Sequence, residues 1–278
     1  MNGFLLIDKP KGYTSFDVCA KIRKKFNIKK VGHTGTLDPF ATGLLVVAVG
    51  KGTRCIPFLE KLSKTYETKI LLGKISETHD TESSVKNILV NQKIYKKEIQ
   101  SILEKNFQGK IKQRPPKFSA IKIDGKRAYD LARKEKNFEI PKRETEIFYT
   151  KILDYDFPYL NLELKVQAGF YVRSLARDLG KILGTGAICE ELRRTFVGDI
   201  NISQAEKIDD VKNLLDPKIL LTNFRQVEIE PERIVDFSVG RAFPFLGKNK
   251  EKILFLHKEK TIGIGEVFGK NVQPKVVF

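Results

Sequence analysis

Residues 32–45, with the sequence GHTGTLDPFATGLL, form the segment that most constrains the fold of this chain. Its three glycines permit backbone angles closed to other residues, and Pro39 directs the preceding Asp38 towards an extended conformation. The apolar run of residues 44–49 predicts a buried strand that anchors one end of the segment. We therefore expect a loop that presents one carboxylate beside a buried strand. An aspartate-proline pair is also common in ordinary turns, and on the residues alone this alternative stays open.

The same segment resembles the active-site loop of the bacterial tRNA pseudouridine synthase B family. The resemblance implies that Asp38 is the catalytic aspartate of an isomerase that converts uridine to pseudouridine at position 55, in the T arm of tRNA, without a cofactor. His33 would belong to the loop surface that meets the flipped nucleotide, so it is assigned to RNA binding. Three chemical routes stay open for Asp38: attack at C1′, attack at C6, or abstraction of a sugar proton.

Two other segments match this family in its substrate-binding motifs. Lys9 and Pro10 match the N-terminal motif, although a solvated lysine before a turn proline is an equal alternative. Tyr66 lies in an alternating segment, residues 64–73, that predicts a strand. The family places a tyrosine here that stacks on the target base, and such stacking is worth roughly 1 to 3 kcal/mol per base.

A helix predicted from the apolar spacing of residues 172–183 carries Arg173 at its start. This segment resembles the motif with the family's active-site arginine, which implies that Arg173 keeps Asp38 charged and oriented, because a neighbouring cation favours the ionised carboxylate. A surface ion pair of little energetic value is the alternative for Arg173. Further along, Leu192 matches a family leucine that packs on the base, while a plain core position explains it nearly as well.

The resemblance also defines the expected organisation, an α+β fold in two domains. Residues 1–222 would form the catalytic domain, a mixed and largely antiparallel sheet with flanking helices. Within it, basic and aromatic residues alternate around two prolines in an insertion at about 108–142, which we expect to clamp the T arm through phosphate contacts. From 223 to 278, short apolar strands with glycine turns predict a small PUA-like RNA-binding β-barrel.

Composition supports a polyanionic partner. The chain has 278 residues, with 51 Lys and Arg against 34 Asp and Glu, so its net charge is 51 − 34 = +17. The basic residues are spread through the chain, which favours a folded surface that tracks RNA phosphates. Three well-separated cysteines give no pattern for a disulfide framework or a zinc site. Residues 1–8 lack the features of a signal peptide or a spanning segment, so we expect a cytoplasmic, metal-free protein that acts as a monomer.

A metal-dependent nuclease needs clustered carboxylates, whereas the segment around Asp38 offers one, and a zinc deaminase needs a histidine-glutamate and cysteine pattern that is absent here. The stronger alternative is a non-catalytic chaperone that binds and refolds tRNA with the same cleft. Replacement of Asp38 separates the enzyme from the chaperone.

Overall fold

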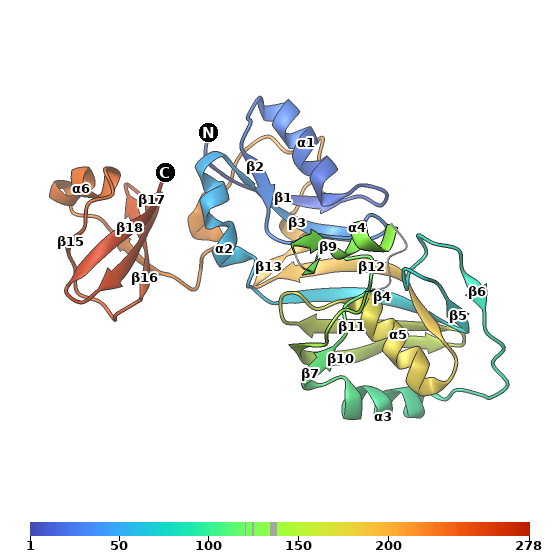
Figure 1. Cartoon of the computed structure of the whole chain (residues 1–278). Helices are drawn as coiled ribbons and strands as arrows, with labels where there is room; N and C mark the ends of the chain where they lie inside the picture. Colours follow the sequence, from blue (N-terminus) through green and yellow to red (C-terminus); the bar gives the residue numbers. More distant parts are fainter. Residues whose placement is uncertain (120, 124, 134–137) are drawn as a thin grey trace.

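The structure is a computed structural model, and it describes residues 1–119, 121–123, 125–133 and 138–278. Of the predicted insertion at 108–142, residues 120, 124 and 134–137 therefore lie outside the described residues. Two sheets dominate the described parts of the chain, one of nine strands and one of five (Figure 1). Two short ribbons accompany them: β5 (Lys74–Ile75) with β6 (Lys86–Asn87), and β8 (Lys122–Ile123) with β9 (Lys126–Arg127).

The nine-stranded sheet follows the order β1-β3-β12-β4-β11-β10-β7, with β2 beside β3 and β13 beside β12. Its strand pairs are antiparallel except for β12 with β3. The strands are β1 (Gly3–Lys9), β2 (Val31–His33), β3 (Thr42–Val49), β4 (Lys64–Leu72), β7 (Gly109–Gln113), β10 (Arg143–Asp156), β11 (Tyr159–Val166), β12 (Ala187–Val197) and β13 (Ile200–Asn201). This mixed, largely antiparallel sheet confirms the predicted architecture.

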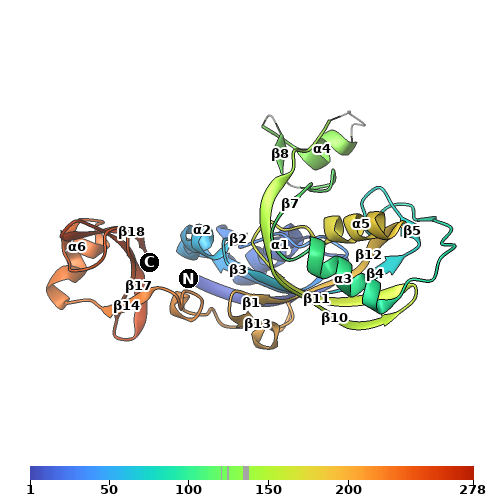
Figure 2. The same ribbon diagram turned by 90° about the horizontal axis from the view of Figure 1, so that it is seen from below.

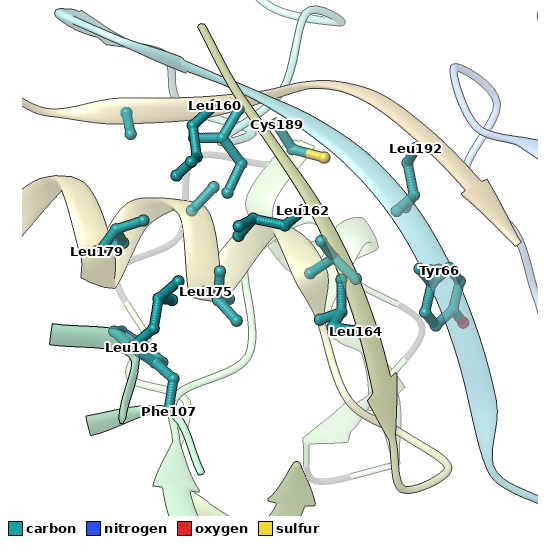
Figure 3. Close-up of a cluster of buried hydrophobic side chains, with 14 of the residues drawn as sticks. Tyr66, Leu103, Phe107, Leu160, Leu162, Leu164, Leu175, Leu179, Cys189 and Leu192 are labelled. Carbon is teal, nitrogen blue, oxygen red and sulfur yellow. The ribbon is translucent and has the colours of Figure 1, made fainter. Parts of the chain in front are cut away.

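Helices α3 (Lys96–Asn106) and α5 (Val172–Leu183) pack on one face of this sheet, and the segment from β7 to α4 (Ala128–Arg133) rises from the same face (Figure 2). The core between helix and sheet uses every second residue of β11, because side chains alternate across a strand. These residues are Leu160, Leu162, Leu164 and Val166, which pack with Leu175 and Leu179 of α5 (Figure 3).

Helix α1 (Ser15–Phe26) packs against another part of the same sheet, formed by β1 and β3. It begins with a capping box, in which the Asp17 amide donates to Thr14 Oγ1 at 3.0 Å and Asp17 Oδ2 accepts from the Thr14 amide at 2.9 Å. Val18 and Ile22 of α1 are buried against β1 and β3. The helix thus fixes the position of the strands on either side of the Asp38 loop.

Strand β3 is buried on both faces, which explains its uninterrupted apolar sequence. Leu45, Val47 and Val49 face α1, and they belong to one hydrophobic cluster. The alternate residues belong to another cluster, which also holds residues of the five-stranded sheet: Leu44, Val46 and Ala48, with Leu254, Leu256, Ile264 and Val276.

The five-stranded sheet follows the order β14-β16-β17-β18-β15. Its strands are β14 (Arg225–Glu228), β15 (Phe243–Pro244), β16 (Lys252–His257), β17 (Lys260–Phe268) and β18 (Asn271–Val277). With the short helix α6 (Ile234–Ser238), it makes a small separate unit at one end of the molecule (Figures 1 and 2). The remaining short helix, α2 (Ile56–Leu59), follows β3. The α+β class with a small C-terminal β unit is therefore confirmed, whereas the exact domain limits stay predictions.

Candidate active site

The loop that carries Asp38 joins β2 to β3 and is tied to the start of α1. Ser15 Oγ accepts a hydrogen bond from the Leu37 amide at 2.9 Å and donates one to the Leu37 carbonyl at 3.3 Å. One residue beyond Asp38, the Pro39 carbonyl accepts from the Gly12 amide at 2.8 Å. Because Ser15 is buried in the first turn of the helix, these bonds fix the loop before any ligand arrives.

Lys9 lies beneath this loop and is fully buried. Its ammonium donates hydrogen bonds to the carbonyls of Tyr13 at 2.6 Å, Pro10 at 3.0 Å and Pro39 at 3.3 Å. Burial lowers the pKa of Lys9 to about 8, against an opposite effect from Asp38. The solvated lysine considered from the sequence is not found. Lys9 instead supports the loop from below while Pro10 is exposed, so substrate contacts of this pair stay predictions.

Asp38 and Arg173 form a two-point ion pair. Arg173 Nη2 donates to Asp38 Oδ1 at 2.8 Å, and Arg173 Nε lies 2.8 Å from Asp38 Oδ2. The arginine side chain is 4% exposed and the aspartate side chain 29%, so water can reach the carboxylate while the guanidinium is held in the protein. The paired planar groups orient each other. The alternative of a weak surface ion pair does not apply to Arg173.

Arg173 has further partners that the sequence did not indicate. Its Nη1 donates to the Thr78 carbonyl at 3.1 Å and lies 3.3 Å from Asp80 Oδ2, and its Nη2 donates to the Phe118 carbonyl at 3.0 Å. Burial alone would lower the pKa of Arg173, but Asp38 and Asp80 raise it more, so the net shift is upward. The guanidinium is therefore held charged between two carboxylates.

Asp80 lies in a polar segment, residues 79–83, whose sequence is typical of a solvated loop. The structure differs, because the Asp80 side chain is wholly buried. Its Oδ1 accepts from Thr78 Oγ1 and from the Glu82 amide. Burial raises the pKa of Asp80, and these hydrogen bonds and Arg173 oppose the increase. A single aspartate in a polar loop has no local signal that distinguishes it from a turn residue, which is why it was missed.

A cavity of about 240 Å³ brings together four of the predicted residues: Asp38, Tyr66, Arg173 and Leu192. Tyr66 of β4 and Leu192 of β12 lie on adjacent strands, at one end of the hydrophobic cluster (Figure 3). Phe170 adds a further apolar wall. The cavity combines flat apolar surfaces with one reachable carboxylate, so it can hold a planar ring beside Asp38 and exclude most water from it.

His33 is not among the described residues that line this cavity. It is half-buried at the end of β2, and its Nδ1 accepts a hydrogen bond from the Gly35 amide at 3.3 Å. Burial and the nearby Arg194 lower the pKa of His33, which favours the neutral ring. The structure thus places His33 as a support of its own turn, and its contact with RNA stays a prediction.

Two cations line the cavity without having been predicted as site residues: Lys64 and Arg194. Both are buried. A period of two could have indicated them, because Lys64 lies two residues before Tyr66 on β4 and Arg194 two residues after Leu192 on β12. Side chains two residues apart on a strand lie on the same face of the sheet. When one residue of a strand is assigned to a site, the residues two positions before and after it are therefore candidates for the same site.

Neither a metal centre nor a spanning helix is found in the part of the chain that the structure describes. There, no group of three or more His, Cys, Asp or Glu side chains is arranged to bind a metal ion. Over the same residues, each helix is too short or too polar to cross a membrane.

The chain matches two models of one protein family over more than half of its length. Residues 23–172 match the model described as "TruB family pseudouridylate synthase (N terminal domain)", and residues 173–222 match the "tRNA pseudouridylate synthase B C-terminal domain". These matches define the class, the pseudouridylate synthases. Within that class, the chain belongs to the TruB family.

Individual relatives agree with this assignment. The chain is 37% identical to a tRNA pseudouridine synthase B from Clostridium kluyveri, over 100% of this chain and 99% of that protein. It is 42% identical to the Geobacter sulfurreducens protein of the same name, over 77% and 70% of the two chains. Among solved structures, an H/ACA RNP bound to a substrate RNA containing 2′-deoxyuridine has a chain with the same fold, with a TM-score of 0.74 at 22% identity, covering 99% of this chain and 84% of that one.

Proposed function

We propose that this chain isomerises uridine to pseudouridine in tRNA, and that its target is position 55 in the T arm. Family membership supports the reaction and the class of substrate. The single observation that supports Asp38 as the catalyst is its two-point pairing with a buried arginine at a cavity with aromatic and apolar walls. An isomerisation returns every atom to the product, so the reaction requires no external donor or acceptor.

The nucleotide must leave its stack to reach this cavity, because the glycosidic bond is otherwise covered, at a cost of a few kcal/mol. Tyr66 and Leu192 would hold the extruded uracil, and Arg173 would keep Asp38 charged and aimed at the nucleotide. Asp38 then assists cleavage of the bond to N1, by attack at C1′ or C6 or by abstraction of a sugar proton. The uracil turns within the cavity and rejoins the ribose through C5.

The rest of the chain would hold the tRNA. We propose that the insertion at about 108–142 grips the T arm from above the cavity, and that residues 223–278 form a PUA-like RNA-binding domain after a catalytic domain of residues 1–222. The high positive charge supports both assignments. The monomeric state and the cytoplasmic location expected from the sequence stay predictions.

The test is replacement of Asp38 by Asn in the full chain, with unmodified tRNA transcripts as substrate. We expect the wild-type protein to produce pseudouridine at position 55, mapped by mass spectrometry, and Asp38→Asn to produce none. The amide keeps the size of the side chain, so tRNA affinity should stay within about threefold. Full pseudouridine formation by the variant would refute the proposal. A wild-type protein that refolds tRNA without forming pseudouridine would favour the chaperone instead.

A further inference from the structure

Lys64 and Arg194 place two positive charges in the wall of the cavity that the proposed mechanism does not use. Lys64 is 5% exposed and Arg194 is 1% exposed. Neither forms an ion pair with a carboxylate of the described residues. Buried charges in proteins are normally paired, because an isolated charge loses its hydration. Two such cations in one cavity therefore indicate an anion that arrives from outside the protein.

The protein holds both cations by backbone carbonyls and leaves donors unused. Lys64 Nζ donates to the carbonyls of Glu60 at 2.5 Å and Leu62 at 2.6 Å, which uses two of its three protons. Arg194 donates from Nε to the Leu44 carbonyl at 2.7 Å and from Nη2 to the Gly35 carbonyl at 3.2 Å. Its Nη1 has no hydrogen-bond partner among the described residues. Each cation is thus fixed in place and keeps at least one N–H donor for a further acceptor.

The two cations flank the same residue, Gly35. A Cβ atom built on this glycine would lie 3.7 Å from Arg194 Nη1 and 3.8 Å from Lys64 Cε. The backbone at this point has φ of +145°, which favours glycine, so the loop stays bare between the two cations. Glycine therefore keeps the space open in which an anion could touch both side chains.

Charge is divided across the cavity. At one end, the single positive charge of Arg173 is shared by Asp38 and Asp80. At the other end, burial and the nearby Arg194 lower the pKa of Lys64 to about 8, although Glu60 opposes this shift, so the two cations repel each other. A ligand that joins an uncharged ring and a sugar to a monoanion would match this division: ring between Tyr66 and Leu192, sugar at Asp38, anion at the cations.

We propose that Lys64 and Arg194 together bind a phosphodiester group adjacent to the target uridine, and that this contact positions the extruded nucleotide over Asp38. The assignment rests on the proposed function, because it takes RNA as the ligand. A guanidinium and a lysine side chain that both lie beside Gly35 suit the spread charge of a phosphate. The site then selects a nucleotide within a chain over free uridine, which lacks this anion.

The test removes the charge from one phosphate at a time. Stem-loop RNAs of the T arm carry a single neutral methylphosphonate, each stereoisomer separately, on the 5′ or the 3′ side of the target uridine. With the wild-type protein, we expect one of these positions to lower kcat/KM by about tenfold or more, as for loss of a charge-assisted contact. The same change at a distant phosphate serves as the control RNA.

The protein side of the test uses Lys64→Met, with Lys61→Ala, an exposed lysine outside the cavity lining, as the matched control. If Lys64 binds that phosphate, Lys64→Met lowers kcat/KM on unmodified RNA about as much as the methylphosphonate does. The two changes combined then cost no more than about threefold beyond either one, because they remove the same contact. Circular dichroism and thermal unfolding establish that the variant is folded, and Arg194→Lys provides a second variant if Lys64→Met is not.

The proposal would be overturned if the losses from Lys64→Met and from the methylphosphonate were additive at both flanking phosphates. It would also be overturned if neither methylphosphonate lowered kcat/KM of the wild-type protein. These outcomes are distinct from failure of the proposed function, in which wild-type protein forms no pseudouridine even in the unmodified stem-loop.

Discussion

Arg173 is held by three separate segments of the chain, and each contributes a different acceptor. Asp38 comes from the β2–β3 loop, Asp80 from the segment between β5 and β6, and the Phe118 carbonyl from the segment after β7. A guanidinium with this many partners has little rotational freedom, so the carboxylate beside it is held in one orientation.

Asp80 is buried and would not contact RNA, but loss of its charge should weaken catalysis through Arg173. We expect Asp80→Asn to lower kcat for pseudouridine formation by about 10- to 100-fold, the equivalent of one charged hydrogen bond, with KM nearly unchanged. Asp178→Asn is the matched control, because Asp178 also pairs with an arginine of α5, Arg177, outside the 240 Å³ cavity. A rise in KM with unchanged kcat would contradict this role of Asp80.

His79 should make stability depend on pH in the acid range. Burial, together with Arg177 and Arg173, lowers its pKa from 6.5 to about 4. Between pH 6.5 and 4 the unfolded chain binds a proton that the folded chain does not, so the free energy of unfolding falls as pH falls through this window. Urea unfolding at pH 7 and pH 5 should show a smaller loss for His79→Asn, a residue that tolerates the positive φ of 61° found here. An equal loss in both proteins would show that His79 titrates normally.

The sequence located Asp38, Tyr66, Arg173 and Leu192, since each lies in a motif and the four meet in one cavity. It could not indicate Asp80, because its burial depends on Arg173, 93 positions away, as 173 − 80 = 93. The hydrogen bond from Lys9 to the Pro39 carbonyl likewise joins residues that are far apart in the sequence, so it depends on the tertiary structure. Motifs therefore indicated four of the residues that line the cavity but not Lys64 and Arg194, and long-range contacts supply the groups that hold Arg173 and the Asp38 loop.

At the scale of elements, the parallel contact between β12 and β3 brings two backbones unusually close at Gly43. This glycine has φ of +104°, and a Cβ atom there would lie 2.4 Å from the Arg194 carbonyl oxygen. The close approach places Arg194 beside the Asp38 loop, since Arg194 pairs with Gly43 in the sheet.

Gly43→Ala should consequently destabilise the protein far more than an alanine at another positive-φ glycine. Gly12 is the matched control, with φ of +85° and nothing within 4 Å of the added Cβ. We expect Gly12→Ala to cost about 1–2 kcal/mol from backbone strain and Gly43→Ala at least about 2 kcal/mol more, from collision with the neighbouring backbone. Urea unfolding of both variants measures the difference, and similar costs would mean that β12 moves aside.

Periodicity predicted several long elements close to their observed limits. The strand expected at 64–73 is β4 (Lys64–Leu72), and the alternating residues 160–166 of β11 all face the core. The apolar spacing that predicts α5 includes Ile182, yet Ile182 is 48% exposed while Leu179 and Leu183 of the same helix are buried. Short elements such as α6 were missed, since five residues give too few repeats to define a period.

At the scale of the whole molecule, the net charge of +17 should dominate the energetics of RNA binding. Cations released from RNA as lysine and arginine replace them make binding weaker in salt. We expect the tRNA dissociation constant to rise on the order of a hundredfold as KCl increases from about 50 to 200 mM, measured by filter binding. Asp38→Asn should show the same slope, because Asp38 contacts no phosphate in the proposed complex. A flat dependence would contradict a surface that tracks phosphates.

The two sheets share one hydrophobic cluster, in which Phe4 of β1 and Val276 of β18 are both buried. Strand β1 precedes β18 by more than 260 residues, as 271 − 9 = 262, so it is synthesised well before β18. During translation, one apolar side of the large sheet therefore stays uncovered until β16–β18 have left the ribosome, and such surfaces promote aggregation of nascent chains. A truncated messenger RNA that ends before those strands would yield a polypeptide with an exposed apolar surface on the large sheet. Quality-control proteases would recognise this surface even though every residue around Asp38 had been made.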